Sequence, residues 1–317
     1  MKIFHGTDNA GILRGTTLTL GVFDGLHVGH QRIMQTVVER AAVTGTVPTV
    51  LTFDPHPRAV LHPASAPPLL QTLDQRLANF EFLGIKQAIV IRFDENFAAI
   101  DAERFLADVV HERLQAREVY LGAGFAFGKN RSGNIGLLRE ISDRLGFRAD
   151  EVDEVQLRGT RISSSIIRRL LADGKVNLAR RMLGRPYGVE GQVIHGNKRG
   201  RTIGFPTANL KPVNRVIPKF GVYATATLID GVWRRSITNV GVRPTFDDEK
   251  MPSIETFVFD FDGDLYGDVL RVRFLYRIRD ERKFSGIDEL KSQIQIDSAT
   301  ALRYFKRQGV ANQLELA

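Results

Sequence analysis

Two histidines among glycines near the N-terminus have the types and spacing of a phosphate-binding turn. The segment DGLHVGH, residues 24–30, follows a strand-like stretch that ends at Phe23 and precedes the apolar pattern of a helix. A helix N-terminus presents unpaired N–H groups and the positive end of the helix dipole, and the imidazoles of His27 and His30 can donate to the same oxygens. We therefore expect phosphate binding here. The alternative is a glycine-rich turn with surface histidines. Zinc is disfavoured because the segment offers no third ligand.

A second helix N-terminus with anion-binding side chains is expected at residues 161–169, RISSSIIRR. The serines 163–165 suit an N-cap region, and Arg161 and Arg168 can reach an anion near it. Taken alone, the segment is more simply interpreted as a solvated cap. The anion-binding interpretation gains support because this is the second such helix start in the same half of the chain.

Two further segments follow strand-like stretches of the first half. Residues 54–57, DPHP, stand where open α/β sheets bind ligands, with a rigid proline turn as the alternative. Residues 122–128, GAGFAFG, imitate a dinucleotide fingerprint, but the glycine spacing is wrong and Phe125 and Phe127 occupy the place of a tight phosphate turn. No P-loop pattern occurs either. NAD binding and a P-loop kinase are therefore disfavoured.

A glycine-rich basic segment in the second half is suited to wrap phosphates. It reads GQVIHGNKRGRTIGFPTAN over residues 191–209. Thr207 and Asn209 are two residues apart on an extended stretch, so their side chains point the same way, and both carry oxygen donors suited to Mg²⁺ or a nucleotide. A basic surface loop is the alternative.

Glu255 interrupts an aromatic strand face. In a regular strand it shares a side with Phe257, Phe259 and Phe261, because side chains alternate. We expect this face to point inward, where a carboxylate is costly unless it has a partner or a chemical role. The alternative is a solvated glutamate at the mouth of the strand.

The elements that must position these residues alternate regularly in the first half of the chain. Apolar strands are separated by helical patterns, and Thr72 and Gln75 form a capping box before one helix. Such alternation predicts a parallel sheet covered by helices. The expected strands are residues 17–23, 48–53, 88–93 and 118–122.

After Gly184 the pattern changes to strands without helices between them. This predicts an antiparallel domain, and the number of strands suggests a small barrel. Asp230-Gly231 and Asp262-Gly263 are expected to form tight turns. The expected strands are residues 191–195, 222–229, 232–240, 254–261 and 269–276, and two final helices are expected to begin near Ser285 and Asp297.

Length and composition fit two globular domains, which we place at residues 1–184 and 185–317. The chain has 317 residues, 43% hydrophobic and 25% charged, which disfavours fibrous and disordered classes. Its net charge of +8 invites an anionic partner, but no basic arm stands out, so cations aimed at phosphates are favoured over nucleic-acid binding. The absence of cysteine excludes thiolate sites. No membrane-spanning run or signal-peptide core occurs, so we expect a cytoplasmic protein without a membrane partner.

Taken together, the motifs resemble the bacterial bifunctional riboflavin kinase/FAD synthetase family. Seven segments occur in the family's order, and the resemblance covers nearly the whole chain. They are GVFDGLHVGH at 21–30, TFDPHP at 52–57, ISSSIIRR at 162–169, GFPTAN at 204–209, NVGVRPTF at 239–246, ETFVFDFDGDLYG at 255–267 and RDERKFSGIDEL at 279–290.

The resemblance implies two activities on two folds. An α/β nucleotidylyltransferase-like, Rossmann-like domain would convert FMN and ATP into FAD and pyrophosphate. An antiparallel six-stranded β-barrel with terminal helices would phosphorylate riboflavin with Mg²⁺ and ATP, releasing ADP. Glu255 would activate the ribityl hydroxyl as the catalytic residue, and Thr207 and Asn209 would hold the metal and nucleotide.

The same resemblance implies further binding residues in each domain. Those expected to bind ATP in the adenylyltransferase domain are Gly21, Phe23, Asp24, Gly25, His27, His30, Arg161, Ser164, Ser165 and Arg168. Those expected to bind flavin there are Asp54, Pro55, His56 and Phe125. Those expected to bind ATP in the kinase domain are Gly191, Gly196, Lys198, Gly204, Thr207 and Asn209. The oligomeric state stays open.

Two positions depart from the family's pattern. Gly124 stands where a polar residue usually precedes Phe-x-Phe-Gly, and Ser165 replaces the usual threonine but keeps a hydroxyl. The glycine leaves open a riboflavin kinase with a weak or inactive adenylyltransferase domain. The GFPTAN segment disfavours a different nucleotidylyltransferase with an unrelated barrel, and the even charge distribution disfavours an RNA-binding barrel protein.

Overall fold

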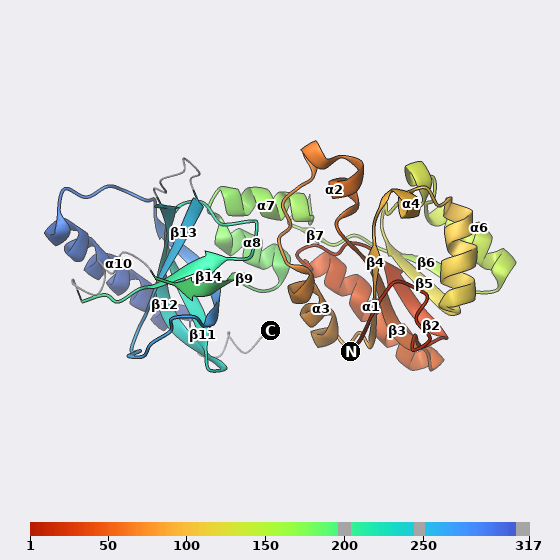
Figure 1. The fold of residues 1–317 in the computed structure, drawn as a ribbon, viewed down its shortest axis with the longest axis horizontal. Helices are drawn as coiled ribbons and strands as arrows, with labels where there is room; N and C mark the ends of the chain where they lie inside the picture. The colour runs from red at the N-terminus through yellow and green to blue at the C-terminus, as the bar shows by residue number, and fades with distance from the viewer. Residues whose placement is uncertain (196–203, 244–250, 309–317) are drawn as a thin grey trace. The chain divides into compact units, whose positions relative to one another are not determined.

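The computed structural model describes residues 1–195, 204–243 and 251–308, and its contacts divide the chain into two units (Figure 1). The first unit is Met1–Ser163 and the second is Ser164–Ala317. This division assigns the helices α7, Ser164–Ala172, and α8, Val176–Leu183, to the second unit. The functional boundary at Gly184 stays a prediction.

The first unit is built on a six-stranded parallel sheet in the order β1-β4-β3-β2-β5-β6. The four strands expected from the sequence are confirmed as β2, β3, β4 and β5. The sequence analysis missed the two edge strands, β1 and β6, because they lack a long buried apolar run. The bounds are β1 Lys2–His5, β2 Thr16–Leu20, β3 Val47–Asp54, β4 Gln87–Arg92, β5 Ala116–Gly122 and β6 Arg148–Val152.

Helices cover both faces of this sheet. One face packs against a π-helix, Phe105–Arg113, and α6, and the other against α1 and α3. The capping box of α3 is confirmed, since Thr72 Oγ1 accepts from Gln75 N at 3.2 Å and Gln75 Oε1 accepts from Thr72 N at 3.1 Å. The helices are α1 Val28–Thr44, α2 Pro57–Leu61, α3 Leu73–Phe82, α4 Glu95–Ala98, α5 Ala102–Arg104 and α6 Ile135–Leu145. A two-stranded hairpin follows, β7 Gln156–Leu157 and β8 Thr160–Arg161.

The second unit is a closed antiparallel barrel in the order β10-β13-β12-β11-β14-β9. The implied six-stranded barrel is therefore confirmed. The Asp230-Gly231 turn is also confirmed, since both residues have positive φ, 51° and 75°, between the paired residues Ile229 and Val232. The strands are β9 Tyr187–Ile194, β10 Ala208–Pro212, β11 Gly221–Ile229, β12 Val232–Arg243, β13 Met251–Val258 and β14 Val269–Arg279.

One strand of this unit was missed, and two expectations for the unit are wrong. Strand β10 was missed because it lies within the glycine-rich segment. The Asp262-Gly263 pair makes no tight turn, since β13 ends at Val258 and β14 begins at Val269. The end of the chain holds one continuous helix, α10, Ile287–Gln308, rather than two. Asp297 does not begin a helix because its carboxylate instead accepts from Arg279 Nε at 2.9 and 3.1 Å.

Hydroxyl groups fill part of the barrel interior, while α10 packs on its outside (Figure 1). Thr225 Oγ1 lies 2.8 Å from Ser236 Oγ and 2.7 Å from Thr238 Oγ1, which lies 2.9 Å from Thr256 Oγ1. These side chains are 1% exposed or less. The alternate residues of β11, Ala224 and Ala226, point to the helix. In the described part of the chain, no helix combines the length and apolar character that crossing a membrane requires.

Candidate functional site

The turn between β2 and α1 uses one of its two histidines as the helix cap. His27 is the N-cap residue of α1, and its Nδ1 accepts from His30 N at 3.3 Å. The two rings stack with centroids 3.6 Å apart, and His30 also meets the edge of Phe23. Because Nδ1 of His27 accepts this hydrogen bond, any further hydrogen bond of the ring is made through Nε2. Both expected phosphate-binding side chains therefore lie at the helix N-terminus, as the sequence predicts.

Backbone geometry explains the glycines and the buried aspartate of this turn. A Cβ at Gly21 would lie 2.9 Å from the ring of Phe23, and Gly25 has φ of 79°. Asp24 is buried, and its carboxylate accepts from Leu70 N at 2.9 Å and from Gln71 N at 3.2 Å. Asp24, which is expected to bind ATP, thus fixes the turn to a loop far along the chain. Direct contact of Asp24 with ATP stays a prediction.

Arg76 is a fully buried cation that the sequence analysis missed. Its Nη1 donates to Val22 O at 2.8 Å and to Thr52 Oγ1 at 3.2 Å, and its Nη2 lies 3.3 Å from Asp54 Oδ1. It therefore ties together the carboxyl ends of β2 and β3. Burial lowers the pKa of Arg76, and the charges of Asp54 and Asp24 oppose that shift. The sequence did carry a signal for a buried cation, because Arg76 lies on the apolar side of α3 with Leu77 and Phe80.

The residues expected to bind flavin are placed at the edge of the same sheet. Asp54 lines a cavity of about 270 Å³ with His5 and Arg92, at the carboxyl ends of β1, β3 and β4. The Asp54-Pro55 peptide is cis. His56 caps α2, since its Nδ1 accepts from Arg58 N at 3.0 Å. The proline-turn interpretation and the ligand interpretation of this segment are therefore compatible.

The aromatic segment after β5 is anchored on the core of the first unit. Phe125 stacks on Phe127, with ring centroids 6.4 Å apart and planes 21° apart. Gly124 is exposed and has φ of 72°, and a Cβ there would meet nothing within 4 Å. The missing side chain at this position therefore leaves open space.

The arginine and serines of the second expected anion site lie around the start of α7. Arg161 in β8 pairs with Glu154 at 3.1 Å and donates to Ala123 O at 3.3 Å. Ser164, Ser165 and Arg168 lie in the first turns of α7, which begins at Ser164 as expected. The predicted helix start is confirmed. The ATP contacts of these four residues stay predictions.

In the second unit, three polar side chains lie in one row across three strands. Glu255 of β13 is the register partner of Asn209 on β10 and of Asn239 on β12. Ser253 Oγ donates to Glu255 Oε1 at 3.2 Å. The row unites two expected site residues with Asn239, which sequence analysis did not select.

The expected inward direction of Glu255 is wrong. Glu255 does share a face of β13 with Phe257, but this face lies on the outside of the barrel, and Phe259, just beyond the end of β13, meets Phe305 of α10 with ring centroids 6.3 Å apart. Thr256 and Val258 take the interior positions instead. Phe261 lies beyond the end of β13. The reason is that the polar barrel interior and the helix-covered exterior both bury alternate residues, so alternation alone does not reveal which side is inside.

A second carboxylate lies beside this row. A Cβ at Gly241 would overlap Glu281 Oε1, so the glycine leaves the space that Glu281 enters. Burial raises the pKa of Glu281, the charge of Glu255 adds to this shift, and Arg279 opposes it. Arg279 in turn pairs with the buried Asp297 of α10. Sequence analysis missed Glu281, although it belongs to the RDERKF segment.

Thr207 and Asn209 line one pocket of about 350 Å³ in the second unit. Asn209 Nδ2 donates to Thr207 O at 3.5 Å, and the carboxylate residues Asp262 and Asp264 line the same pocket. Hydroxyl, amide and carboxylate oxygens are the donors that Mg²⁺ prefers, so this donor set fits the ion. Within the described residues, no group of three His, Cys, Asp or Glu side chains is arranged to hold a metal. A magnesium ion here would therefore depend on these mixed donors and on substrate phosphates.

The remaining expected kinase residues have other positions. A Cβ at Gly191 would overlap the backbone of Lys211, so this glycine permits the close pairing of β9 and β10. Gly204 has φ of 86° in the turn before the GFPTAN segment's last residues. Gly196 and Lys198 lie outside the described residues. Contact of these four residues with ATP stays a prediction.

Comparison with known proteins assigns both units to described families. The FAD synthetase family model matches residues 10–166 and the riboflavin kinase family model matches residues 183–305. Bifunctional riboflavin kinase/FMN adenylyltransferases from Haemophilus influenzae and Bacillus subtilis are each 38% identical to the chain, and cover 96% of it and 99% and 98% of their own lengths. A solved structure titled as a macrolide-efflux protein from Streptococcus pneumoniae is 30% identical, covers 94% of this chain and 98% of its own, and superposes with a TM-score of 0.86.

Proposed function

The chain belongs to the family of bifunctional riboflavin kinase/FMN adenylyltransferases, and we propose that residues 1–184 carry the adenylylation and residues 185–317 the phosphorylation. The enzyme phosphorylates riboflavin to FMN with ATP and adenylylates FMN to FAD with release of pyrophosphate. The observation that carries this proposal is the match of two family models to successive segments that have two different folds. It favours two activities over a kinase with an inactive first unit, which only Gly124 suggests.

In the kinase reaction we assign Glu255 as the general base. A ribityl hydroxyl is a poor nucleophile at neutral pH, so its proton must be taken as its oxygen attacks the γ-phosphorus of ATP. The proton passes to the Glu255 carboxylate, the bond from the γ-phosphorus to the bridging oxygen breaks, and ADP leaves. Asn209 and Asn239 flank Glu255 in register, which suits them to hold the hydroxyl beside it.

Magnesium would be held by Thr207 and Asn209, which line the same pocket. When bound, the ion supplies neutralisation of the phosphate charge. Asn209 thus belongs both to the metal pocket and to the Glu255 row. Because Asn209 lines the pocket and is also the register partner of Glu255, a nucleotide bound in the pocket would lie next to the general base Glu255.

The adenylylation site requires charge stabilisation rather than a base. The phosphate of FMN is already largely ionised, because a phosphate monoester has a second pKa of about 6. One of its oxygens attacks the α-phosphorus of ATP, and pyrophosphate leaves. We assign His27 Nε2, His30 and the N–H groups at the start of α1 to the phosphates. The proposed ATP contacts are Arg161, Ser164, Ser165 and Arg168. The proposed flavin contacts are Asp54, Pro55, His56 and Phe125. The proposed location of the enzyme is the cytoplasm.

Glu255→Gln tests the assignment of the base, because glutamine keeps the shape of the side chain and its bond from Ser253. Loss of a general base lowers turnover about 10²- to 10⁴-fold. We expect this fall in FMN formation with little change in riboflavin affinity and full FAD formation from supplied FMN. The matched control is Glu190→Gln, which removes a barrel carboxylate paired with Arg271. Equal loss of both activities, or full FMN formation, would refute the role.

A further inference from the structure

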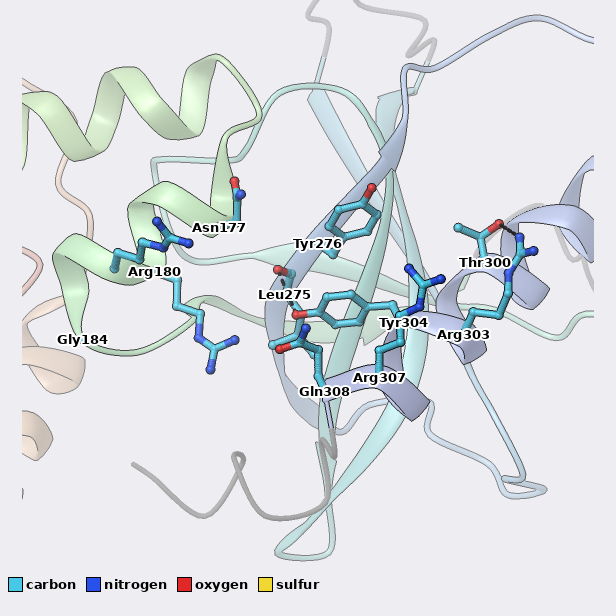
Figure 2. A pocket seen from close by; sticks show the side chains of 11 residues that line it. Asn177, Arg180, Gly184, Leu275, Tyr276, Thr300, Arg303, Tyr304, Arg307 and Gln308 are labelled. Carbon is cyan, nitrogen blue, oxygen red and sulfur yellow. Dashed lines mark hydrogen bonds between the residues drawn. The ribbon is translucent and has the colours of Figure 1, made fainter.

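The second unit contains another pocket, apart from the one lined by Thr207 and Asn209. Its volume is about 800 Å³, and α8, β14 and α10 form its walls (Figure 2). We call it the arginine pocket, defined by Arg180, Arg181, Arg303 and Arg307 together with Tyr276 and Tyr304. None of these residues belongs to the sites assigned above.

The lining of this pocket is rich in positively charged side chains. Four guanidinium groups line it, and the lining contains no aspartate or glutamate among the described residues. Arg181, Arg303 and Arg307 are exposed, and within the described ranges none of them pairs with a carboxylate. Arg303 and Arg307 are four residues apart on α10, a spacing at which like charges destabilise a helix. These arginines therefore repel one another, and a bound anion would neutralise that repulsion.

An aromatic surface lies among the arginines. Tyr276 and Tyr304 stack with ring centroids 5.2 Å apart and planes 15° apart. Figure 2 shows both rings between Arg303 and Arg307 of α10 on one side and Arg180 of α8 on the other. Tyr304 is held by its hydroxyl, which donates to Leu275 O at 3.5 Å. Tyr276 is 41% exposed, so part of this aromatic surface is accessible.

We propose that the arginine pocket binds a nucleotide, a ligand that joins a planar ring to two or three phosphates. Guanidinium groups bind phosphate oxygens in a forked geometry, and aromatic and guanidinium planes both stack on planar rings. The volume lies in the range of pockets for ligands of this size. None of the residues assigned to either reaction lines this pocket, so the proposal does not depend on either assignment.

Arginine footprinting on the full-length protein tests the proposal without interference from the active sites. Phenylglyoxal labels accessible guanidinium groups, and peptide mass spectrometry reports each arginine separately. At an ATP concentration about ten times Kd, nine-tenths of the sites are filled, so labelling of Arg181, Arg303 and Arg307 falls roughly tenfold. Pyrophosphate, which lacks the ring, should protect less, and uncharged riboflavin should not protect. Arg215, an exposed arginine outside the pocket, is the internal reference.

A pair of variants distinguishes ligand binding from a structural role. Arg181→Gln combined with Arg307→Gln removes two pocket charges, while Arg215→Gln combined with Lys306→Gln removes two charges outside the pocket lining. In the pocket variant, ATP should no longer protect Arg303, and the melting temperature without nucleotide should be equal or higher because repulsion is relieved. The control variant should keep the protection.

Three results would overturn the proposal. One is unchanged labelling of the pocket arginines at ATP concentrations that protect other arginines of the chain. Another is continued protection of Arg303 by ATP in the pocket variant. The third is a marked fall in the melting temperature of that variant without nucleotide, because it would assign the arginines to the fold.

Discussion

Replacing Arg76 by lysine or methionine perturbs a buried side chain that joins the ends of β2 and β3. Arg76 is 0% exposed, and its guanidinium donates to Val22 O, Thr52 Oγ1 and Phe53 O and pairs with Asp54. These strand ends lead into the two segments proposed to bind ATP and flavin. Lysine keeps the charge but not the fork, while methionine keeps much of the volume but has neither.

The magnitude follows from what each variant leaves unpaired. Breaking a buried charged group from its partners costs about 3–5 kcal/mol, and a hydrogen bond to a charged group contributes about 1.5–3 kcal/mol. We expect Arg76→Met to lose about 3–5 kcal/mol, because buried carbonyls lose their donors. At roughly 2–4 °C per kcal/mol for a unit of this size, its melting temperature falls by about 6–20 °C. Arg76→Lys should lose less, because its ammonium group still reaches part of the acceptor set.

The assay compares the two activities in one protein. FAD formation from supplied FMN should fall at least about tenfold in both variants, because small displacements of positioning groups cost up to about a hundredfold in rate. FMN formation by the second unit is the internal control and should persist. A methionine variant that melts near the parent temperature with full FAD formation would refute this reasoning, because a volume-filling role would then suffice.

Four further substitutions test other parts of the structure. Glu281→Gln should lower FMN formation about tenfold without weakening riboflavin binding, because a second carboxylate favours arrival of a proton at Glu255. Gly241→Ala should have the same effect, because the added Cβ would displace Glu281. Unchanged turnover in both variants would count against this role. Asp280 has a pKa lowered to about 2 by Arg277 and Lys219, so Asp280→Asn should lower the free energy of unfolding at neutral pH. The difference from the parent should shrink as the pH falls from about 4 to 2 in urea titrations, and a difference that keeps its neutral-pH size at pH 2 would contradict the prediction. In Gly124→Asn the new side chain enters open space, and asparagine tolerates the positive φ at this position. FAD formation should rise about two-fold or more from one added hydrogen bond. A lower rate with the fold intact would show that another residue already makes this contact with the nucleotide.

Local patterns revealed much of the architecture and of the site. The capping box of Thr72 and Gln75, the turn at Asp230-Gly231 and the start of α7 depend on neighbours within a few residues, so they could be predicted. The same holds for His27 and His30 at the start of α1. The segments that resemble the family predicted roles for Glu255, Thr207 and Asn209, and these roles stay predictions.

Several failures share one cause, which is that alternation does not specify what lies on each side. Glu255 was expected inside the barrel because its face is aromatic. That face in fact lies on the outside of the barrel, while hydroxyls of Thr225, Thr238 and Thr256 fill part of the interior. Edge strands β1 and β6 were missed because a half-exposed strand has no continuous apolar run.

The sequence by itself determined the order of elements, the two fold classes, the family and most of the residues proposed to bind substrates. Tertiary structure alone decided how the buried charges are partnered. Asp24 meets Leu70 N across 46 positions of sequence, and Arg279 meets Asp297 across 18. Arg76 joins two strand ends, and Glu281 enters the space at Gly241. The physical reason is that a buried polar group must find a partner in three dimensions, and that partner is set by packing and register, not by spacing along the chain.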